Sequence, residues 1–357
     1  MFVREFVEKH SVWLARLLLI VCIGFVAWWL QGFGATMPGA KAAPPEFTDR
    51  KLYQLIIERV SAGDSYYHAA AMAHRTHGYP LIPWVTVRPP TLTYVVAWLG
   101  DGGSASLMRA LVGASMIAWP IALDRAGYRP IEVLLSAIAV LAGGFIAFYD
   151  HFYFHEMWSG AFLSLAFALY RPNRALAAVV LAVIACAFRE FAILAVGAGF
   201  FWAFLDKRRA EATQWFVGVV IVAAFYAWHA FQVVAFRMDG DVVSQGWSGM
   251  IGTLQALYSV VSNSIYRAPG IAVGGTLLIL SLFGWLAARD RAWIVASFAL
   301  AWIAIIALFS RTENYYWSQV LLPWLPIGLI LAPRAAFLAL RRGQGAKPRR
   351  RHVHRVS

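Results

Sequence analysis

The sequence predicts an all-α polytopic membrane protein with about ten transmembrane helices and a large first extracytoplasmic loop. Three observations support this prediction. The 357 residues are 61% hydrophobic and 14% charged, whereas soluble domains carry about 25% charged residues. Several apolar runs approach the ~20 residues that a helix needs to cross a bilayer. Lysine and arginine are also distributed unevenly among the segments that join these runs.

The predicted spans follow one another as apolar runs between polar segments. They cover roughly residues 11–32, 105–123, 131–149, 157–170, 174–188, 190–205, 213–235, 268–287, 292–309 and 317–338. The first run ends in paired tryptophans, as an interfacial anchor does, so we expect a retained helix rather than a cleaved signal peptide. The spans form one domain, residues 1–338, which a basic cytoplasmic tail follows at 339–357.

The positive charges set the orientation, because cytoplasmic loops carry an excess of lysine and arginine. An N-terminus inside the cell places the entire net charge of +13 on the cytoplasmic side. An even number of spans puts the C-terminus there as well. This pattern favours a multi-pass protein of the inner or plasma membrane and argues against nucleic-acid binding. Cys22 and Cys186 lie in apolar runs, which predicts neither a disulfide framework nor a cysteine zinc site.

Two long segments then face the outside, at residues 33–104 and 236–267. Within the first, residues 91–100 follow a pair of prolines and would cover only ~15 Å as a helix, about half a bilayer. We expect this helix to lie at the outer membrane surface. In the second, Asp-Gly-Asp at 239–241 could hold a metal, but a turn is favoured because Asp-Gly is chiefly a turn sequence.

Arg189 and Glu190 are the only charges among the 31 residues between Arg174 and Asp206. One helix of that length would reach ~46 Å, which exceeds the ~30 Å hydrocarbon core. We therefore expect two short helices with Arg189-Glu190 at their apex. An ionisable pair at such depth indicates a functional site, with a structural ion pair as the alternative.

Another polar group precedes the short apolar run at 157–170. It consists of Asp150, His151, His155 and Glu156, which we expect in the same depression of the outer face. The two histidines are four residues apart and would share a face of one helix. Together with Asp150 they are weak candidates for a divalent metal site, although such histidines more often line a polar interface. The sequence requires no cofactor.

The last outer loop, residues 310–319, brings Arg311, Glu313, Tyr315 and Tyr316 to this face. Arginines there can form paired hydrogen bonds with phosphate oxygens, and an acid can act as a general base. Because this surface lies beside the bilayer, a lipid phosphate would present itself here.

In their order along the chain, these elements resemble the GT-C fold glycosyltransferases, polytopic enzymes that take a sugar from a polyprenyl-phosphate carrier. The resemblance extends over about residues 10–335, mostly as topology. The segments that carry it are GDSYYHAAA (63–71), GYPLIPWVTVRPPTLTYVVAWLG (78–100), DGGSASLMRALVGAS (101–115), HEMWSGAFLSLAFALYRPNR (155–174), ACAFREFAIL (185–194) and RTENYYWSQVLLPWLPIGL (311–329).

The resemblance implies transfer of a sugar from a polyprenyl-phosphate donor to a lipid, polysaccharide or protein acceptor at the extracytoplasmic face. It implies Asp64 as the general base. Asp49 and Glu156 are alternatives, because no paired acid accompanies Asp64 as in the family pattern. The leaving phosphate would be stabilised by arginines, namely Arg189 and Arg311 with help from Arg88 or Arg267.

The resemblance also implies substrate-orienting side chains. These are Tyr66, Tyr67 and His68 around Asp64, Glu190, which would hold Arg189, and His155 and Tyr315. A structural role for Asp64, as the N-cap of the helix that follows it, is compatible with catalysis. His74 and His77 are expected on the solvated surface of that helix.

Two other interpretations compete with an enzyme. A lipid or solute transporter or flippase would place charges midway along its spans and show internal repeats. Here the charges gather at one face and no repeat is found in the sequence. A non-catalytic subunit of an envelope assembly complex is the third interpretation.

Overall fold

The computed structural model describes residues 2–35, 47–244, 250–287 and 292–340. These residues form helices and loops, and their one β-pairing is a bridge between Ile82 and Val243. The α-helices are α1 (Phe2–Ala35), α2 (Asp49–Ser61), α3 (Tyr66–Thr76), α4 (Thr91–Arg125), α5 (Pro130–Gly144), α6 (His155–Leu169), α7 (Leu176–Phe188), α8 (Ile193–Leu205), α9 (Arg209–Ala235), α10 (Gly252–Ser262), α11 (Ile271–Ala287), α12 (Ala292–Phe309) and α13 (Ile327–Leu340). Short 3₁₀ helices join them, namely η1 (Trp84–Thr86), η2 (Phe145–Phe148), η3 (Asp150–Tyr153), η4 (Glu190–Ala192), η5 (Ile265–Arg267) and η6 (Thr312–Val320).

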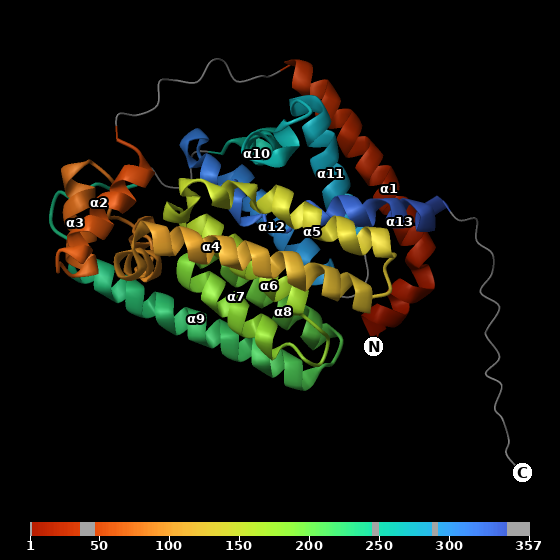
Figure 1. Ribbon diagram of the computed structural model, residues 1–357, viewed down its shortest axis with the longest axis horizontal. Helices are drawn as coiled ribbons and strands as arrows, with labels where there is room; N and C mark the ends of the chain where they lie inside the picture. The colour runs from red at the N-terminus through yellow and green to blue at the C-terminus, as the bar shows by residue number, and fades with distance from the viewer. Residues whose placement is uncertain (1, 36–46, 245–249, 288–291, 341–357) are drawn as a thin grey trace, which may run out of the picture.

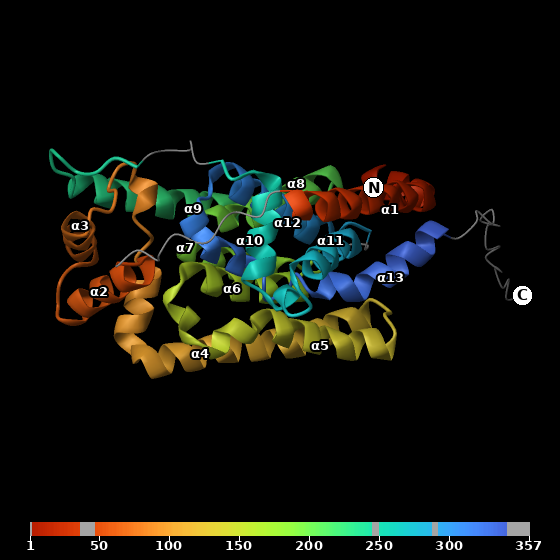
Figure 2. The same cartoon turned by 90° about the horizontal axis from the view of Figure 1, so that it is seen from above.

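The helices form an elongated bundle with α2 and α3 at one end (Figures 1 and 2). α4 packs along α5 and α6, α6 pairs with α7, and α9 packs against α7 and α8. Toward the other end, α1, α11 and α13 form a second group, and α12 contacts both groups through α8 and α11. Of the two predicted outer segments, residues 33–104 contain α2 and α3, and residues 236–267 contain α10.

Four helical stretches are long and apolar enough to cross a membrane. They are Trp13–Gly32, Trp84–Arg125, Pro130–Phe148 and Arg209–Ala235. Five shorter apolar helices of 10–17 residues accompany them, at Leu176–Phe188, Glu190–Leu205, Ile271–Ala287, Trp293–Phe309 and Ile327–Leu340. The prediction of an α-helical membrane protein is confirmed at this level, and the number of ten spans stays a prediction.

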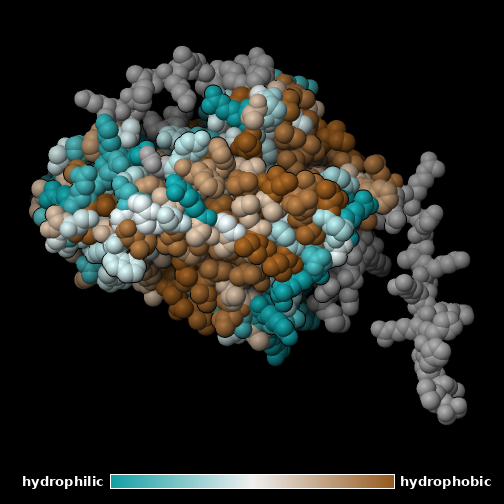
Figure 3. Space-filling model, in the orientation of Figure 1, coloured by the Kyte–Doolittle hydropathy of each residue, from teal (hydrophilic) through white to brown (hydrophobic). Residues whose placement is uncertain are grey.

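The surface of the bundle carries a hydrophobic band between two hydrophilic ends (Figure 3). The band covers α4 and α5, while hydrophilic residues gather over α2 and α3 and at the end where α9 begins. Large apolar side chains are exposed within the long helices, such as Ile117 on α4 at 67% and Phe231 on α9 at 71%. Contiguous apolar surface of this kind is expected where lipid surrounds the protein.

The predicted break near residue 100 is present inside α4. Gly100 has φ 67° and ψ 176°, which separates a first helical segment from the long one that follows. A glycine accepts this positive φ without the strain that a Cβ would add. Pro90 occupies the N-cap position of the first segment. This segment therefore matches the helix predicted at residues 91–100.

The predicted pair of short helices is also present. α7 ends at Phe188, Arg189 adopts an extended conformation, and α8 begins at Ile193 after η4. Arg189 is fully buried and Glu190 nearly so. The apex of the hairpin is therefore inside the protein, where Arg88, just before α4, contacts Glu190.

The last predicted span, residues 317–338, is wrong in its first half. Residues 312–320 form η6, and α13 begins only at Ile327. Pro323 and Pro326 lack the N–H group that a continuous α-helix needs, and the chain between η6 and α13 forms hydrogen-bonded turns instead. This segment is nevertheless buried, with side chains of α6, α11 and α12 in contact with Pro323, Leu325 and Trp324.

α11 and α13 cross at Gly284 and Gly328, where the two backbones approach closely. A Cβ at Gly328 would overlap the carbonyl oxygen of Ser281, and a Cβ at Gly284 would overlap that of Gly328. Gly328→Ala should therefore lower the stability of the protein by about 1–3 kcal/mol, as overpacking does. Thermal unfolding in detergent micelles tests this, with Gly24→Ala as control because a Cβ there meets nothing within 4 Å. Equal melting temperatures for the two variants would contradict the close crossing.

Candidate functional site

Four charged side chains meet inside the protein, and we call Arg88, Glu156, Arg189 and Glu190 the ionic cluster. Nε of Arg189 lies 2.9 Å from Oε1 of Glu156, and both side chains are fully buried. Nη1 of Arg189 also pairs with Glu190. Nη1 of Arg88 lies 3.2 Å from the same Glu190 oxygen. Two cations thus balance two anions, as the high cost of an unpaired buried charge requires.

Three separate parts of the chain build this cluster. Arg88 precedes α4, Glu156 lies in the first turn of α6, and Arg189-Glu190 forms the break between α7 and α8. Tyr66 on α3 fixes the backbone of Arg88, since its hydroxyl donates to the Arg88 carbonyl oxygen at 2.5 Å. The Arg88 side chain is 13% exposed, so it is the accessible cation of the cluster.

Aromatic side chains enclose Arg189. Its guanidinium lies 4.8 Å from the ring centre of Trp317 in η6 and 5.4 Å from that of Phe191. Such cation–π contacts replace part of the hydration that the buried cation has lost. Arg189 is therefore fixed on several sides and cannot move toward a ligand without breaking these contacts.

Several buried polar atoms around the cluster lack a hydrogen bond among the described residues. They are both ring nitrogens of His155, both carboxylate oxygens of Glu156, Oγ of Ser159, and Nε and Nη2 of Arg189. The short contact between Arg189 Nε and Glu156 is accordingly an ion pair outside hydrogen-bond geometry. Because buried polar atoms are normally paired, this concentration indicates hydrogen-bonding capacity that water or a ligand can use.

Asp49 lies beside the ionic cluster, at the start of α2. The Thr48 hydroxyl caps this helix by accepting from the Lys51 backbone N–H at 3.4 Å. Asp49 and Tyr53 are four residues apart and share one face of α2. The hydroxyl of Tyr316 donates to the Asp49 carboxylate, and Nε of Arg88 lies 3.4 Å from the Tyr53 hydroxyl. One helical turn therefore links a partly exposed acid to the accessible arginine.

Asp64 occupies a different position, in the turn between α2 and α3. Its carboxylate lies 2.6 Å from Nδ1 of His68 and 3.2 Å from Nε of Arg59. The hydrogen bond with His68, supported by Arg59, lowers the pKa of Asp64 and makes it a weaker base. No contact among the described residues joins Asp64 to the ionic cluster.

The expected companions of Asp64 are only partly correct. His68 contacts Asp64, but the Tyr66 hydroxyl reaches the Arg88 carbonyl and the Tyr67 hydroxyl lies 3.1 Å from Nδ1 of His229. The helical period explains Tyr66, because a residue two positions after Asp64 points to another side of α3, whereas the Tyr67 hydroxyl contacts His229 of α9 instead. The expectation of an Asp64 cap is also wrong, since Ser65 occupies the N-cap position without a side-chain bond.

Among the described residues, no side-chain contact joins Arg267 or Arg311, the other predicted phosphate ligands, to the ionic cluster. Arg267 is exposed in η5, and Arg311 precedes η6 with its backbone N–H bonded to the Asn314 side chain at 3.1 Å. Tyr315 is partly exposed next to Tyr316. Among the described residues, no side-chain ion pair ties either arginine to an acid. Glu313 has a side chain outside the described residues.

The structure does not have the geometry that was predicted for a metal site. His151 lies in η3 and His155 begins α6, with Phe154 extended between them, so the two histidines do not share one helix. Nδ1 of His151 lies 2.8 Å from Nε2 of Gln319, and the His155 ring packs 4.9 Å from that of Tyr53. The side chain of Asp150 is outside the described residues. In the part of the chain that is described, no group of three His, Cys, Asp or Glu side chains could hold a metal.

The Asp-Gly-Asp sequence forms the turn that was favoured. Asp241 accepts from the Met238 backbone N–H at 2.8 Å and from Arg75 of α3 at 2.6 and 3.0 Å. Gly240 has φ 88°, which suits glycine. This turn therefore attaches the second outer segment to the first.

His74 was expected on the solvated surface of α3, but its side chain is buried. Its Nδ1 lies 2.9 Å from the Pro80 carbonyl oxygen, and burial lowers its pKa to about 4. The small alanine side chains of α3 let neighbouring segments pack closely against this helix, and that packing encloses His74. His77 is partly exposed and stacks on Phe47 at 3.6 Å between ring centres.

The attachment through Asp241 should weaken in acid. Its hydrogen bond with Arg75 lowers the pKa of Asp241, so the stabilisation is present above the unfolded pKa of ~3.9 and is lost as the pH falls through the lower folded value. Limited proteolysis of residues 236–244 should accelerate below about pH 4. Asp241→Asn should accelerate it already at pH 7, whereas Asp239→Asn serves as the matched control. A cleavage rate in Asp241→Asn that equals wild type at pH 7 would contradict this role.

Sequence reasoning did not identify Tyr53 or the pairing of Tyr316 with Asp49. The spacing of Asp49 and Tyr53 was a visible signal, because residues four apart on a helix share a face. The partner of Asp49 was not visible, since Tyr316 is 267 residues away in the chain.

Comparisons with known proteins return no match to a protein-family model, a curated protein or a solved structure. The fold and the site together define an α-helical membrane protein with a buried ionic cluster near one end of its bundle.

Proposed function

We propose that this protein is a membrane glycosyltransferase that moves a sugar from a polyprenyl-phosphate carrier to a lipid, polysaccharide or protein acceptor. One observation carries the proposal. Asp49, a partly exposed carboxylate, lies one helical turn before Tyr53, whose hydroxyl contacts Arg88, the accessible arginine, and Arg88 in turn pairs with Glu190 of the buried network. Transfer from a phosphate carrier needs this combination of a proton acceptor and a cation for the leaving group.

The proposed topology has ten spans, formed by α1, the second segment of α4, α5, α6, α7, α8, α9, α11, α12 and α13. Both termini are then cytoplasmic, and α2 and α3 lie on the extracytoplasmic side with the active site beneath them. The hydrophilic surface over α2 and α3 supports this assignment (Figure 3), as does the excess of lysine and arginine in the opposite loops.

In the proposed reaction, the acceptor hydroxyl attacks the anomeric carbon of the sugar. Its proton passes to the Asp49 carboxylate as the new C–O bond forms. The bond from the anomeric carbon to the carrier phosphate breaks, and the electron pair leaves with the phosphate. Arg88 stabilises the negative charge that develops there. Tyr316 holds Asp49 in place, and Glu190 positions Arg88 relative to Arg189.

The structure of the site favours Asp49 over the two other predicted bases. Glu156 is fully buried beside Arg189, where an acceptor hydroxyl cannot approach it. Asp64 is engaged by His68 and Arg59, which weakens it as a base. A divalent metal that shields the donor phosphate stays compatible with this scheme, but no step requires it.

The test is sugar transfer by the purified full chain in lipid, with a panel of polyprenyl-phosphate sugars and candidate acceptors. We expect turnover with at least one donor, and loss of about 10²-fold or more in Arg88→Gln, the order seen when one donor to a developing oxyanion is removed. Arg267→Gln is the matched control because that arginine is exposed. Absence of turnover with every donor, or equal loss in both variants, would overturn the proposal.

A flippase is the second candidate. It is favoured by an interruption in the helical structure. Transporters build their sites from discontinuous helices, and the buried turns between η6 and α13 interrupt one predicted span in this way. The same reconstituted protein distinguishes the two. Movement of a lipid-linked sugar across the bilayer without release of the sugar would favour the flippase.

A further inference from the structure

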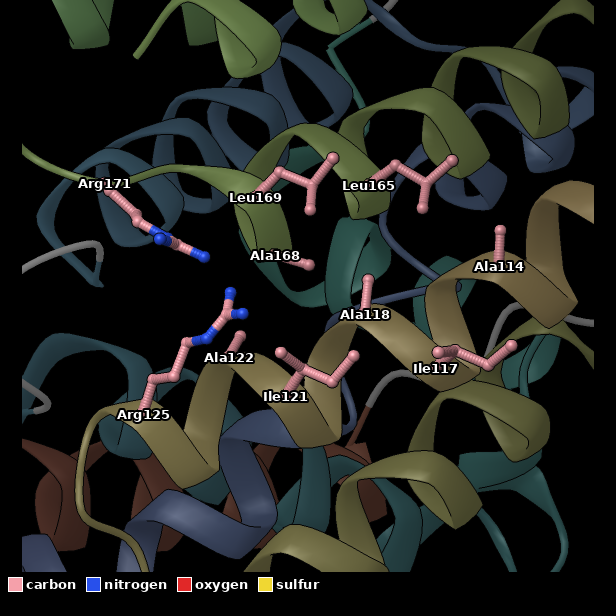
Figure 4. A pocket seen from close by; sticks show the side chains of 10 residues that line it. All are labelled: Ala114, Ile117, Ala118, Ile121, Ala122, Arg125, Leu165, Ala168, Leu169 and Arg171. Atoms are coloured by element: carbon pink, nitrogen blue, oxygen red, sulfur yellow. The ribbon is translucent and has the colours of Figure 1, made fainter. Parts of the chain in front are cut away.

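A hollow between α4 and α6 (Figure 4) lies near the C-terminal ends of both helices, away from α2 and α3 (Figure 1). Its volume is about 390 Å³. Ala114, Ala118 and Ala122 recur every four residues along one face of α4, and their small side chains leave this space. Ile121 and Leu169 line its sides and are themselves exposed at the surface. The hollow is therefore an apolar groove that opens outward from the bundle.

Two arginines close the end of this groove. Arg125 of α4 and Arg171, which follows α6, point toward one another across the mouth in Figure 4. Both are exposed, and among the described residues neither side chain forms an ion pair. Two acids near Arg171 are already engaged, since Asp206 and Glu211 both pair with Arg208, and the exposed Asp124 beside Arg125 leaves the group with a net positive charge. Two converging guanidinium groups create a positive potential that an anion would neutralise.

The backbone on both sides of the mouth is fixed. Tyr170 donates to Glu211 at 2.9 Å and the Asn173 backbone N–H to the same carboxylate at 2.7 Å, which holds the loop that carries Arg171. Beyond Arg125, the Tyr128 N–H bonds to the Leu123 carbonyl at 3.1 Å and closes a tight turn. A ligand between the arginines therefore meets a largely formed site, which lowers the entropy lost on binding.

The length of the groove fits one leaflet of a membrane. From Arg125 back to Ala114 the helix rises ~16 Å, about half of the ~30 Å hydrocarbon core. An acyl chain that starts at the arginines would thus end near the middle of the bilayer. The exposed side chains along the groove, Ile117, Ile121 and Leu169, are all apolar, so lipid is its natural neighbour.

We propose that this groove binds an anionic phospholipid. The phosphate lies between Arg125 and Arg171, and one acyl chain lies along the alanines of α4. Basic pockets between membrane helices bind anionic headgroups in this way. Under the proposed topology the lipid belongs to the cytoplasmic leaflet, but the binding itself does not depend on sugar transfer.

Native mass spectrometry of the full chain from detergent micelles tests the proposal, with dioleoyl phosphatidylglycerol, dioleoyl phosphatidylcholine and inorganic phosphate as separate probes. We expect wild type to retain phosphatidylglycerol in preference to phosphatidylcholine. The double variant Arg125→Gln/Arg171→Gln should bind phosphatidylglycerol about tenfold more weakly or worse, because two charged contacts are lost. Arg209→Gln, an exposed arginine at the same end outside the groove, is the matched control for surface charge.

Ala118→Trp separates a lipid from a free anion, because it fills the groove and leaves both arginines in place. It should abolish retention of phosphatidylglycerol and leave any binding of inorganic phosphate unchanged. Retention of phosphatidylglycerol in Ala118→Trp at the wild-type level would overturn the acyl-chain site. Equal binding of both phospholipids, or an unchanged double variant, would overturn the headgroup site. Dimerisation of wild type that Ala118→Trp prevents would assign the groove to a second copy of the chain instead.

Discussion

Asp49→Asn should lower the turnover number for sugar transfer about 10²–10⁴-fold, the range that general acid–base groups contribute. The substitution keeps the shape of the side chain and an oxygen that the Tyr316 hydroxyl can donate to. It removes the negative charge that accepts the proton of the acceptor hydroxyl. Donor binding, measured as the KM for the polyprenyl-phosphate sugar, should change little because Arg88 stays in place.

Asp64→Asn is the matched comparison. Asp64 is 25% exposed and is held by His68 and Arg59 away from the ionic cluster. We expect its activity to stay within about threefold of wild type, because a surface substitution typically changes a free energy by about 0.5 kcal/mol. Initial rates of both variants, at matched amounts of monodisperse protein, make the comparison. If Asp64→Asn is inactive and Asp49→Asn is active, the general base is Asp64 and not Asp49.

Arg189→Gln should destabilise the protein by about 3–5 kcal/mol, the effect of removing one partner from a buried ion pair. The variant leaves Glu156 charged and fully buried without its cation, whereas Glu190 keeps Arg88. Thermal unfolding followed by tryptophan fluorescence measures the change. Arg267→Gln, at an exposed arginine, should leave the melting temperature unchanged.

The double variant Arg189→Met/Glu156→Met tests the cause of that loss. It removes both members of the pair, so no unpaired charge is left, and apolar replacement of a buried pair is often neutral. We expect most of the lost stability to return. If the double variant is as unstable as Arg189→Gln, the unpaired charge of Glu156 is not the cause.

Much of the fold could be predicted because it depends on local properties of the chain. Apolar runs predicted the helices, and a run too long for one bilayer crossing predicted the α7–α8 break at Arg189-Glu190. The break at Gly100 followed from the short surface helix before it. The first half of the last span was placed wrongly, because hydropathy does not distinguish an α-helix from the buried hydrogen-bonded turns that contain Pro323 and Pro326.

What the sequence by itself determined is which side chains are available near the outer face and where helices begin and end. Only the tertiary structure decided which of them meet. Asp49 and Asp64 both lie at the starts of polar helices in one loop, so their local chemistry is alike. Tyr316 reaches Asp49 across 267 residues of chain, while His68 and Arg59 engage Asp64. Contacts between distant segments depend on packing of the whole bundle, and no local pattern records them.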